Sequence, residues 1–425
     1  MKANIGCLLA LFLLFCSHAT LPIDNPHFYR ALRFWDEPRF ERNKLSSWQL
    51  NSGFARTSHS RDDSGKIGPL FDIIGPQNMQ LIGLGVPNLD PANPIDQILI
   101  ALAELPQNGT FGKLSFTGNF ALFECIGEYY QNLKNGFFLQ FHMPLIRSLT
   151  ISNIHFEDLS PRDDTFPNIT TPEWQAFLGD LGPIFNRYGV RFKPTSHRTG
   201  IGDFSFLAGW AGTYQDTCIL DFLDASAKIG VLFPTAQTTN IDQPFDLPLG
   251  YNGHYGLPLK FDCAIGFFDW VTIGFHSGAL FLFKKDRTIR LKTAEQQNGF
   301  ILLAQNKVQI DPGTIWELGT YFKADHFVRG LSLLAGYSFT KRDADSLELK
   351  TGGSYFNELV INSDERLRGW NMHTVHAMIE YDCADTLRDV GPRIGFWFDI
   401  IAGGRRIFNA HLYDLMIGLD CAWVY

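Results

Sequence analysis

The sequence predicts an all-β protein: a transmembrane antiparallel β-barrel of about twelve strands (alternative fourteen), with long external loops that contain short helices. Three observations predict it. Many segments alternate apolar and polar residues, the gaps between them alternate in length, and the chain closes on an alternating strand that ends with Trp423 and Tyr425. Such strands put apolar groups toward lipid and mixed groups toward the lumen, and the closing pattern, with Gly418, resembles an outer-membrane assembly signal.

Alternation with a period of two, bounded by turn residues, predicts the individual strands. The twelve expected ranges are 46–58, 112–128, 136–151, 201–214, 219–235, 255–267, 270–283, 314–325, 331–342, 370–383, 391–402 and 406–425.

Charges are sorted to one face of several strands. In 255–267, Leu259 and Phe261 share one side, whereas Lys260 and Asp262 share the other. Because a charge facing lipid costs about 2–4 kcal/mol at mid-membrane, this sorting favours a barrel with a charged interior. The same sorting recurs in three strands, where Glu317, His376 and Asp399 join the charged faces: 314–325, 370–383 and 391–402.

The gaps between strands predict the orientation in the membrane. Outer-membrane barrels have short periplasmic turns and long external loops, and an even strand count returns both termini to the periplasm. The gaps alternate between long and short up to the final turn at 403–405, in the order 59–111, 129–135, 152–200, 215–218, 236–254, 268–269, 284–313, 326–330, 343–369 and 384–390.

The N-terminus predicts export. A basic start, an apolar core and Ser17-His18-Ala19 indicate a signal peptide over 1–19, followed by a periplasmic segment over 20–45 and the barrel over 46–425. Removing Lys2 with the signal changes the formal net charge from -8 to -9, which excludes a nucleic-acid partner. The expected location is the bacterial outer membrane, and the expected partners are its lipid, the barrel-assembly machinery and a small-molecule solute.

Two loop segments carry helix signals. Asn93-Pro94 opens an expected helix that runs to Leu105, because proline suits the first helical position. Thr171-Pro172 opens a second, which Gly182-Pro183 is expected to end. Helices that gate the barrel mouth and helices that merely cap the loops both remain open.

The cysteines point to neither a disulfide framework nor a metal site. No C-x-x-C or His-rich spacing accompanies them, so we expect small apolar thiols facing lipid, and no cofactor or metal. Those of the mature chain are Cys125, Cys218, Cys263, Cys383 and Cys421.

The candidate site is a belt of charges that line the lumen at one level in its periplasmic half. Two interpretations remain: a constriction that selects solutes by charge and weakly favours cations, or a salt-bridge network that fills the lumen. Its members are Glu124, Asp224, Lys228, Lys260, Asp262, Lys323, Glu380, Asp382, Arg393 and Asp420.

Two segments show a family resemblance. Gly200-Ile-Gly-Asp-Phe204 resembles a G-x-G-D strand start, and Ile229-Gly-Val-Leu-Phe-Pro-Thr235 resembles a strand end, in a family of outer-membrane proteins linked to phenol and other aromatic degradation. This family is akin to the long-chain fatty-acid transporters. The resemblance implies a barrel, and transport of hydrophobic or aromatic molecules.

The predicted function is therefore an outer-membrane pore or transporter for passive passage of small molecules, and not an enzyme. One alternative is a structural or surface-interaction barrel with a plugged lumen. A second is an outer-membrane lipid hydrolase, which needs a Ser–His pair with an orienting acid. His276 and Ser277 face opposite sides of a strand, and the same objection is raised against Ser58-His59-Ser60.

Overall fold

The computed structural model describes residues 21–22, 45–104, 111–160, 172–215, 220–268, 270–328, 330–350, 355–383 and 390–422. The expected signal peptide, almost all of the expected periplasmic segment, and the terminal Trp423 and Tyr425 lie outside these ranges.

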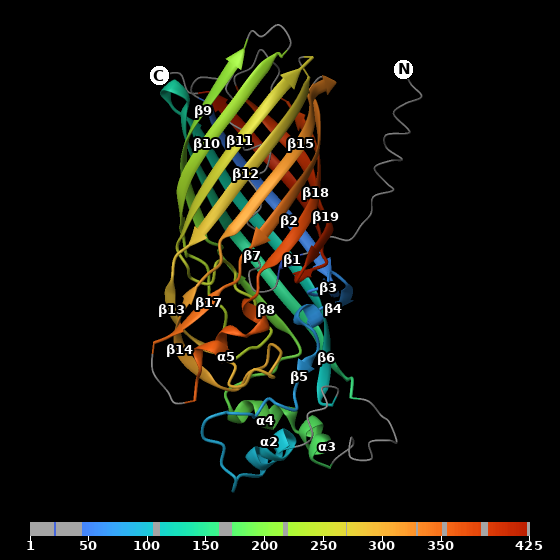
Figure 1. Cartoon of the computed structure of the whole chain (residues 1–425). Coiled ribbons are helices and arrows are strands. Elements are labelled where there is room, and N and C mark those ends of the chain that lie inside the picture. The colour runs from blue at the N-terminus through green and yellow to red at the C-terminus, as the bar shows by residue number, and fades with distance from the viewer. Residues whose placement is uncertain are drawn as a thin grey trace, which may run out of the picture.

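Twelve antiparallel strands close into a barrel (Figure 1). The main sheet has 14 strands. Two of them are short and lie outside the barrel, β5 (Gln77–Asn78) and β8 (Ser196–Gly200). The other twelve form the barrel, which is closed by the pairing of β6 with β7. The predicted fold class and all twelve predicted strands are confirmed. They are β2 (Leu45–Thr57), β6 (Lys113–Asn132), β7 (Phe137–Asp158), β9 (Phe204–Gln215), β10 (Phe222–Phe233), β11 (Gly256–Phe267), β12 (Val271–Leu282), β15 (Ile315–Val328), β16 (Leu331–Arg342), β18 (Trp370–Asp382), β19 (Val390–Arg405) and β21 (His411–Ala422).

Several strand boundaries differ from the prediction; β6 and β7, for example, continue to Asn132 and Asp158, beyond the expected ends at 128 and 151. The final turn was expected at 403–405, but β19 continues to Arg405 because the chain there leaves the barrel as β20 (Ile407–Phe408). β20 pairs with β3 (His59–Arg61) on one side and with β1 (Leu21–Pro22) on the other. The strand expected from 201 is interrupted at 201–203, which separates β8 from β9.

Burial alternates along every barrel strand. One face exposes apolar side chains, and the other face is buried and largely polar. An apolar outer wall around a polar interior suits a barrel that spans a membrane. One exposed apolar residue from each strand, in the order given above, is Leu50, Phe123, Leu145, Trp210, Ile229, Phe261, Ile273, Leu318, Tyr337, Ile379, Phe396 and Ile417.

The described cysteines follow the same alternation. Cys125, Cys263 and Cys421 are half-buried beside inward-facing acids, Cys383 is exposed, and all four are free thiols. Cys218 lies outside the described residues.

The long loops fold into a cap at one end of the barrel (Figure 1). It contains η2 (Asp72–Ile74), α2 (Pro94–Glu104), α3 (Pro172–Gly179), α4 (Leu181–Arg187), α5 (Glu358–Asn362) and η4 (Glu365–Leu367), while η3 (Lys134–Gly136) forms a turn at the opposite end. Both predicted loop helices are confirmed, but Gly182-Pro183 begins α4 instead of ending α3. Pro183 fits there because the first helical turn has no partner for its backbone N–H groups. Among the described residues, no helix is both long and apolar enough to cross a membrane.

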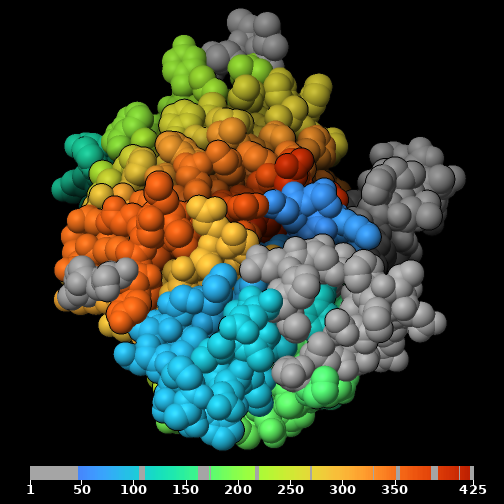
Figure 2. Space-filling view, turned by 60° about the horizontal axis from the view of Figure 1, so that its bottom comes forward, coloured from blue at the N-terminus to red at the C-terminus, as the bar shows by residue number. Residues whose placement is uncertain are grey.

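A shared apolar core holds the cap against the barrel. Trp174 and Phe177 of α3, Phe185 of α4 and Phe71 pack in one buried cluster with Leu122 of the barrel wall. A three-stranded sheet of β13 (Lys285–Arg290), β14 (Gln305–Asp311) and β17 (Ser346–Leu349) and the strand β4 (Ile67–Pro69) complete this end. Figure 2 shows these segments packed side by side over the end of the barrel.

Candidate functional site: a charged lumen and the segment that crosses it

The structure places all ten predicted lumen residues on the inward faces of their strands. Asp224, Asp262 and Lys323 are half-buried, and the others are buried: Glu124, Lys228, Lys260, Glu380, Asp382, Arg393 and Asp420. They do not share one level. Asp420 lies two residues from the end of β21 at Ala422, whereas Lys260 lies seven residues from the same end of β11 at Phe267.

One charged group lies near the short-turn end and centres on Arg393, which is 1 % exposed. Its Nη2 lies 3.1 Å from Asp420 Oδ1 and donates to Ser47 Oγ at 2.9 Å, while Nη1 lies 3.7 Å from Glu380 Oε2. Ser47 in turn donates to Asp420 at 2.7 Å. The guanidinium lies over Gly418, where a Cβ would come within 3.4 Å of it. Gly418 therefore packs directly under this network.

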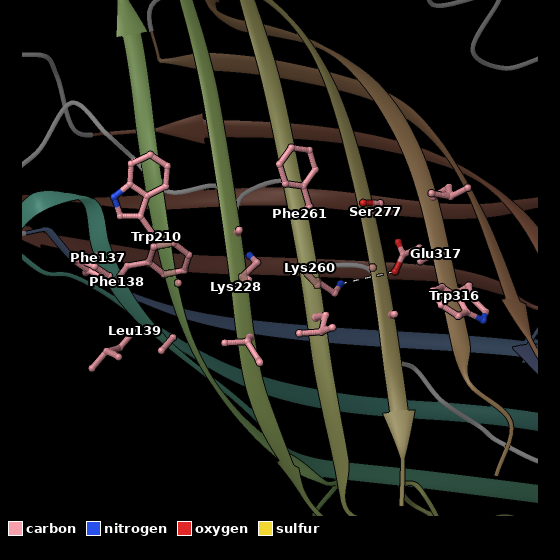
Figure 3. A pocket seen from close by; sticks show the side chains of 18 of the residues that line it. Phe137, Phe138, Leu139, Trp210, Lys228, Lys260, Phe261, Ser277, Trp316 and Glu317 are labelled. Carbon is pink, nitrogen blue, oxygen red and sulfur yellow. Dashed lines mark ion pairs between the residues drawn. The ribbon is translucent and has the colours of Figure 1, made fainter. Parts of the chain in front are cut away.

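A second group lies farther along the lumen. Lys228 and Lys260 are direct partners in the pairing of β10 with β11. Like charges at opposed positions repel, so each needs a carboxylate nearby. Lys228 Nζ lies 3.8 Å from Asp262 Oδ2, and Lys260 Nζ lies 3.8 Å from Glu317 Oε2 (Figure 3). His276 Nε2 contacts the other Glu317 oxygen at 3.2 Å.

The lysines of this group lie behind an apolar concavity of about 1060 Å³, which Figure 3 shows. Its exposed lining residues are all apolar: Leu133, Phe137, Trp210, Ile229, Phe261, Trp316 and Leu318. The concavity is therefore part of the lipid-facing wall rather than of the lumen.

Sequence reasoning missed Arg147 and His142 as interior residues. Arg147 Nη2 lies 3.1 Å from Glu124 Oε2, and His142 Nδ1 lies 2.9 Å from Glu128 Oε1. The two residues have different parity on β7 because a bulge at Leu145 shifts the pairing with β6. A bulge inserts one residue and reverses the alternation beyond it, so a strict period of two cannot place both. Glu317, by contrast, followed the alternation of its strand.

The segment between β10 and β11 reaches across the mouth of the barrel. Leu249 is fully buried against Gly200, and its carbonyl accepts a hydrogen bond from Arg147 Nη1 at 2.9 Å. On the other side, Tyr251 belongs to a buried cluster with Leu232, Leu280, Leu282 and Ile315, which lie on the inward faces of β10, β12 and β15. Residues 245–251 therefore lie across the mouth of the lumen, between β7 on one side and the ends of β10, β12 and β15 on the other.

Asp203 holds both ends of this segment. Its carboxylate accepts hydrogen bonds from the backbone N–H of Ala236, at 2.8 Å, and from that of Tyr251. A Cβ on Gly250 would collide with the same carboxylate, so this position requires glycine. One carboxylate thus joins Ala236 and Tyr251, the two places where the loop between β10 and β11 meets the barrel wall. We call this junction the neck of the segment.

The two segments that carried the family resemblance meet at this neck. Thr235 donates to the carbonyl of Gly202 at 2.6 Å and accepts from the N–H of Phe204 at 3.2 Å. The first motif therefore leads into β9, which begins at Phe204 instead of 201, and the second contains the end of β10, at Phe233 instead of 235. The interruption at 201–203 leaves Asp203 buried.

One expectation about Ser–His pairs is corrected. His276 is buried in the lumen and Ser277 faces outward, as predicted. Ser58 Oγ, however, lies 3.0 Å from His59 Nδ1, because β2 ends at Thr57 and the chain there is no longer a strand. This contact is exposed and joins sequence neighbours.

A closed barrel with an apolar outer wall, a charged interior and a capped mouth defines a transmembrane β-barrel of the outer-membrane type. The chain matches no protein-family model and no curated protein. Among solved structures, it resembles an outer-membrane channel from Pseudomonas putida F1, with 9 % identity over 91 % of this chain and 99 % of that one and a TM-score of 0.45.

Two other structures show the range of such barrels. The P. putida toluene transporter TodX has 10 % identity over 91 % of this chain and 90 % of its own, with a TM-score of 0.29. The β domain of the Bordetella autotransporter BrkA has 8 % identity over 90 % and 100 %, with a TM-score of 0.34. At such low identity and TM-score, none of these likenesses carries an argument about function.

Proposed function

We propose that the chain is a transport protein of the bacterial outer membrane, which lets small molecules, including hydrophobic or aromatic ones, pass without an energy source. The observation that supports it is the sorting of side chains: apolar residues cover the outside of a closed barrel, and charged residues line its inside. A soluble protein gains by burying apolar groups, so an inverted barrel suits a membrane and a polar path through it.

The described conformation is a closed one under this proposal. The segment 245–251 lies across the mouth of the lumen, and buried ion pairs fill the lumen from Arg393 to Glu124. Passage requires the segment to leave Arg147 and Asp203. A narrow lumen of twelve strands lies between side-chain-filled and open barrels, so a small displacement changes its permeability strongly.

A second candidate is a structural or surface-interaction barrel with a permanently plugged lumen. The ion pairs around Arg393 favour it, because three polar partners at 2.9–3.7 Å leave this cation little freedom. The large external cap would then be the interacting part.

Planar-bilayer recording of the purified chain, together with uptake into liposomes of toluenesulfonate and of a small sugar, neither of which crosses a protein-free bilayer readily, separates these candidates. Transport predicts solute uptake above that of protein-free liposomes, and an increase when Arg147→Ala frees the segment. If neither protein conducts or admits either solute, the barrel is plugged and the transport proposal fails.

A further inference from the structure

Three inward side chains on neighbouring strands form a hydrogen-bonded chain that the proposed transport function does not use. They are Ser338 of β16, His376 of β18 and Asp399 of β19. Ser338 Oγ lies 2.7 Å from His376 Nε2, and His376 Nδ1 lies 2.7 Å from Asp399 Oδ1. The serine and the acid therefore contact different nitrogens of one imidazole.

The sheet register creates this arrangement. His376 is the direct partner of Asp399 on one side and of Gly336 on the other. Because Gly336 has no side chain, the ring can reach past it to Ser338, two residues farther along β16. All three side chains share a face because barrel side chains alternate.

The acid is itself held in place. Trp397 Nε1 donates to the same Asp399 oxygen, and the Trp397 ring lies 5.8 Å from the His376 ring. A nucleophile within reach of a base, with the base oriented by a third group, is the arrangement that activates a serine. Such a triad is recognised by geometry and roles, independently of fold and of residue order along the chain.

We propose that Ser338, His376 and Asp399 form a hydrolytic triad on the lumen wall that cleaves small hydrophobic carboxylic esters. His376 Nε2 takes the Ser338 proton as Oγ bonds to the ester carbonyl carbon. The carbon–oxygen bond to the alcohol then breaks, and the same proton passes to the departing alcohol. Water, deprotonated by His376, attacks the acyl-serine and releases the carboxylic acid, which restores the Ser338 hydroxyl.

The surroundings of Ser338 suit an ester with an apolar acyl group. Gly319, the strand partner of Ser338, is covered by the ring of His276, so a second imidazole lies on the strand face next to the triad. On the other side of His376 lies a buried apolar cluster inside the barrel, which offers a surface for the acyl group. Its members are Tyr321, Leu334, Met378, Trp397 and Met416.

Access depends on the lumen. Ser338 is 3 % exposed, so an ester reaches it only when the closed conformation opens. Asp203→Asn weakens the neck of the crossing segment without touching the triad, and we expect it to raise the rate of hydrolysis above that of the unmodified chain.

The test is labelling of the folded full chain in detergent with a fluorophosphonate probe, with the labelled peptide identified by mass, and hydrolysis of p-nitrophenyl butyrate. We expect label on Ser338, loss of label and hydrolysis in Ser338→Ala, and a loss of about 10²–10⁴-fold in Asp399→Asn, which leaves His376 without its orienting acid. The matched control is Ser332→Ala, an inward serine of the same strand that donates to Asp325 and accepts from the backbone N–H of His326, instead of bonding to an imidazole ring.

Labelling needs no variant, so a folding defect in Ser338→Ala does not decide the matter. If the probe labels Ser338 in neither the unmodified chain nor Asp203→Asn, the triad proposal is overturned. That result leaves the transport proposal standing, because conductance and solute uptake are measured independently.

Discussion

Buried charges inside this barrel occur with partners on adjacent strands. Arg393 meets acids from the strands on both sides, and Glu124 meets Arg147 across one pairing. Removing one partner of a buried pair leaves an uncompensated charge, which typically costs about 3–5 kcal/mol. Exposed pairs are worth much less, because water already solvates their charges.

We therefore expect Asp420→Asn to lower the free energy of unfolding by about 3–5 kcal/mol, since it leaves Arg393 with a weaker set of partners. Urea unfolding followed by the shift of gel mobility on heating measures this. Asp311→Asn is the control, because Asp311 and its partner Lys284 are 44 % and 57 % exposed. Equal stability of the two variants would show that the Arg393 network does not hold the barrel together.

Gly250 makes a second prediction at this scale. Any side chain there collides with Asp203, so Gly250→Ala should break hydrogen bonds at the neck of the crossing segment. If the free energy that favours the closed conformation falls by about 1 kcal/mol, the open population rises roughly fivefold. Bilayer recordings should show this as a higher open probability. Gly182→Ala is the control, because a Cβ at that position meets no atom within 4 Å. Unchanged recordings for Gly250→Ala would argue against the segment as the barrier.

At the scale of elements, the external helices are joined by one buried carboxylate. Asp96 of α2 accepts from Arg187 of α4 at 2.7 Å through both oxygens and from the Tyr188 hydroxyl at 2.6 Å. The hydrogen bond from Arg187 lowers the pKa of Asp96 to about 2, against the tendency of burial to raise it. The link is thus charged at neutral pH.

This lowered pKa predicts an acid-labile cap. Because folding lowers the pKa of Asp96, its carboxylate contributes stability that is fully present above the ordinary value of 3.8. This stability is lost as the pH falls through about 2. The protection of α2 and α4 amides against hydrogen exchange, relative to the intrinsic rate at each pH, should therefore fall between pH 4 and 2. Asp96→Asn should exchange faster at neutral pH and lose this dependence. Parallel pH profiles of the two proteins would contradict the assignment.

At the scale of the whole molecule, the long loops all emerge at the capped end, and the short turns lie at the other. The asymmetry predicts the orientation in the membrane. With native cysteines replaced by alanine, Gln296→Cys in a long loop should react with an impermeant thiol reagent in intact cells. Lys134→Cys in a short turn should react only after the cells are broken. The reverse labelling pattern would invert the barrel.

Much of this architecture could be predicted from sequence, because alternation reports directly on two faces with different solvents. The lipid side excludes charge at every outward position, so Lys260, Asp382 and Arg393 could be placed inward without coordinates. Loop lengths predicted which end of the barrel carries the short turns. The strands and the loops could be told apart because only the strands of a closed barrel can cross lipid.

Tertiary structure decided what the alternation does not encode. The bulge at Leu145 reverses parity on β7, so Arg147 emerged as an interior residue only in the folded wall. The pairing register decides which side chains meet. A strand shifted by two residues against its neighbour would keep the same side chains facing inward. Only the observed register joins Ser338, His376 and Asp399. Along strands without a bulge, the sequence by itself determined which side chains face inward. Contacts between residues far apart along the chain determined their partners and the path of the segment that crosses the lumen, because these depend on closure of the whole barrel.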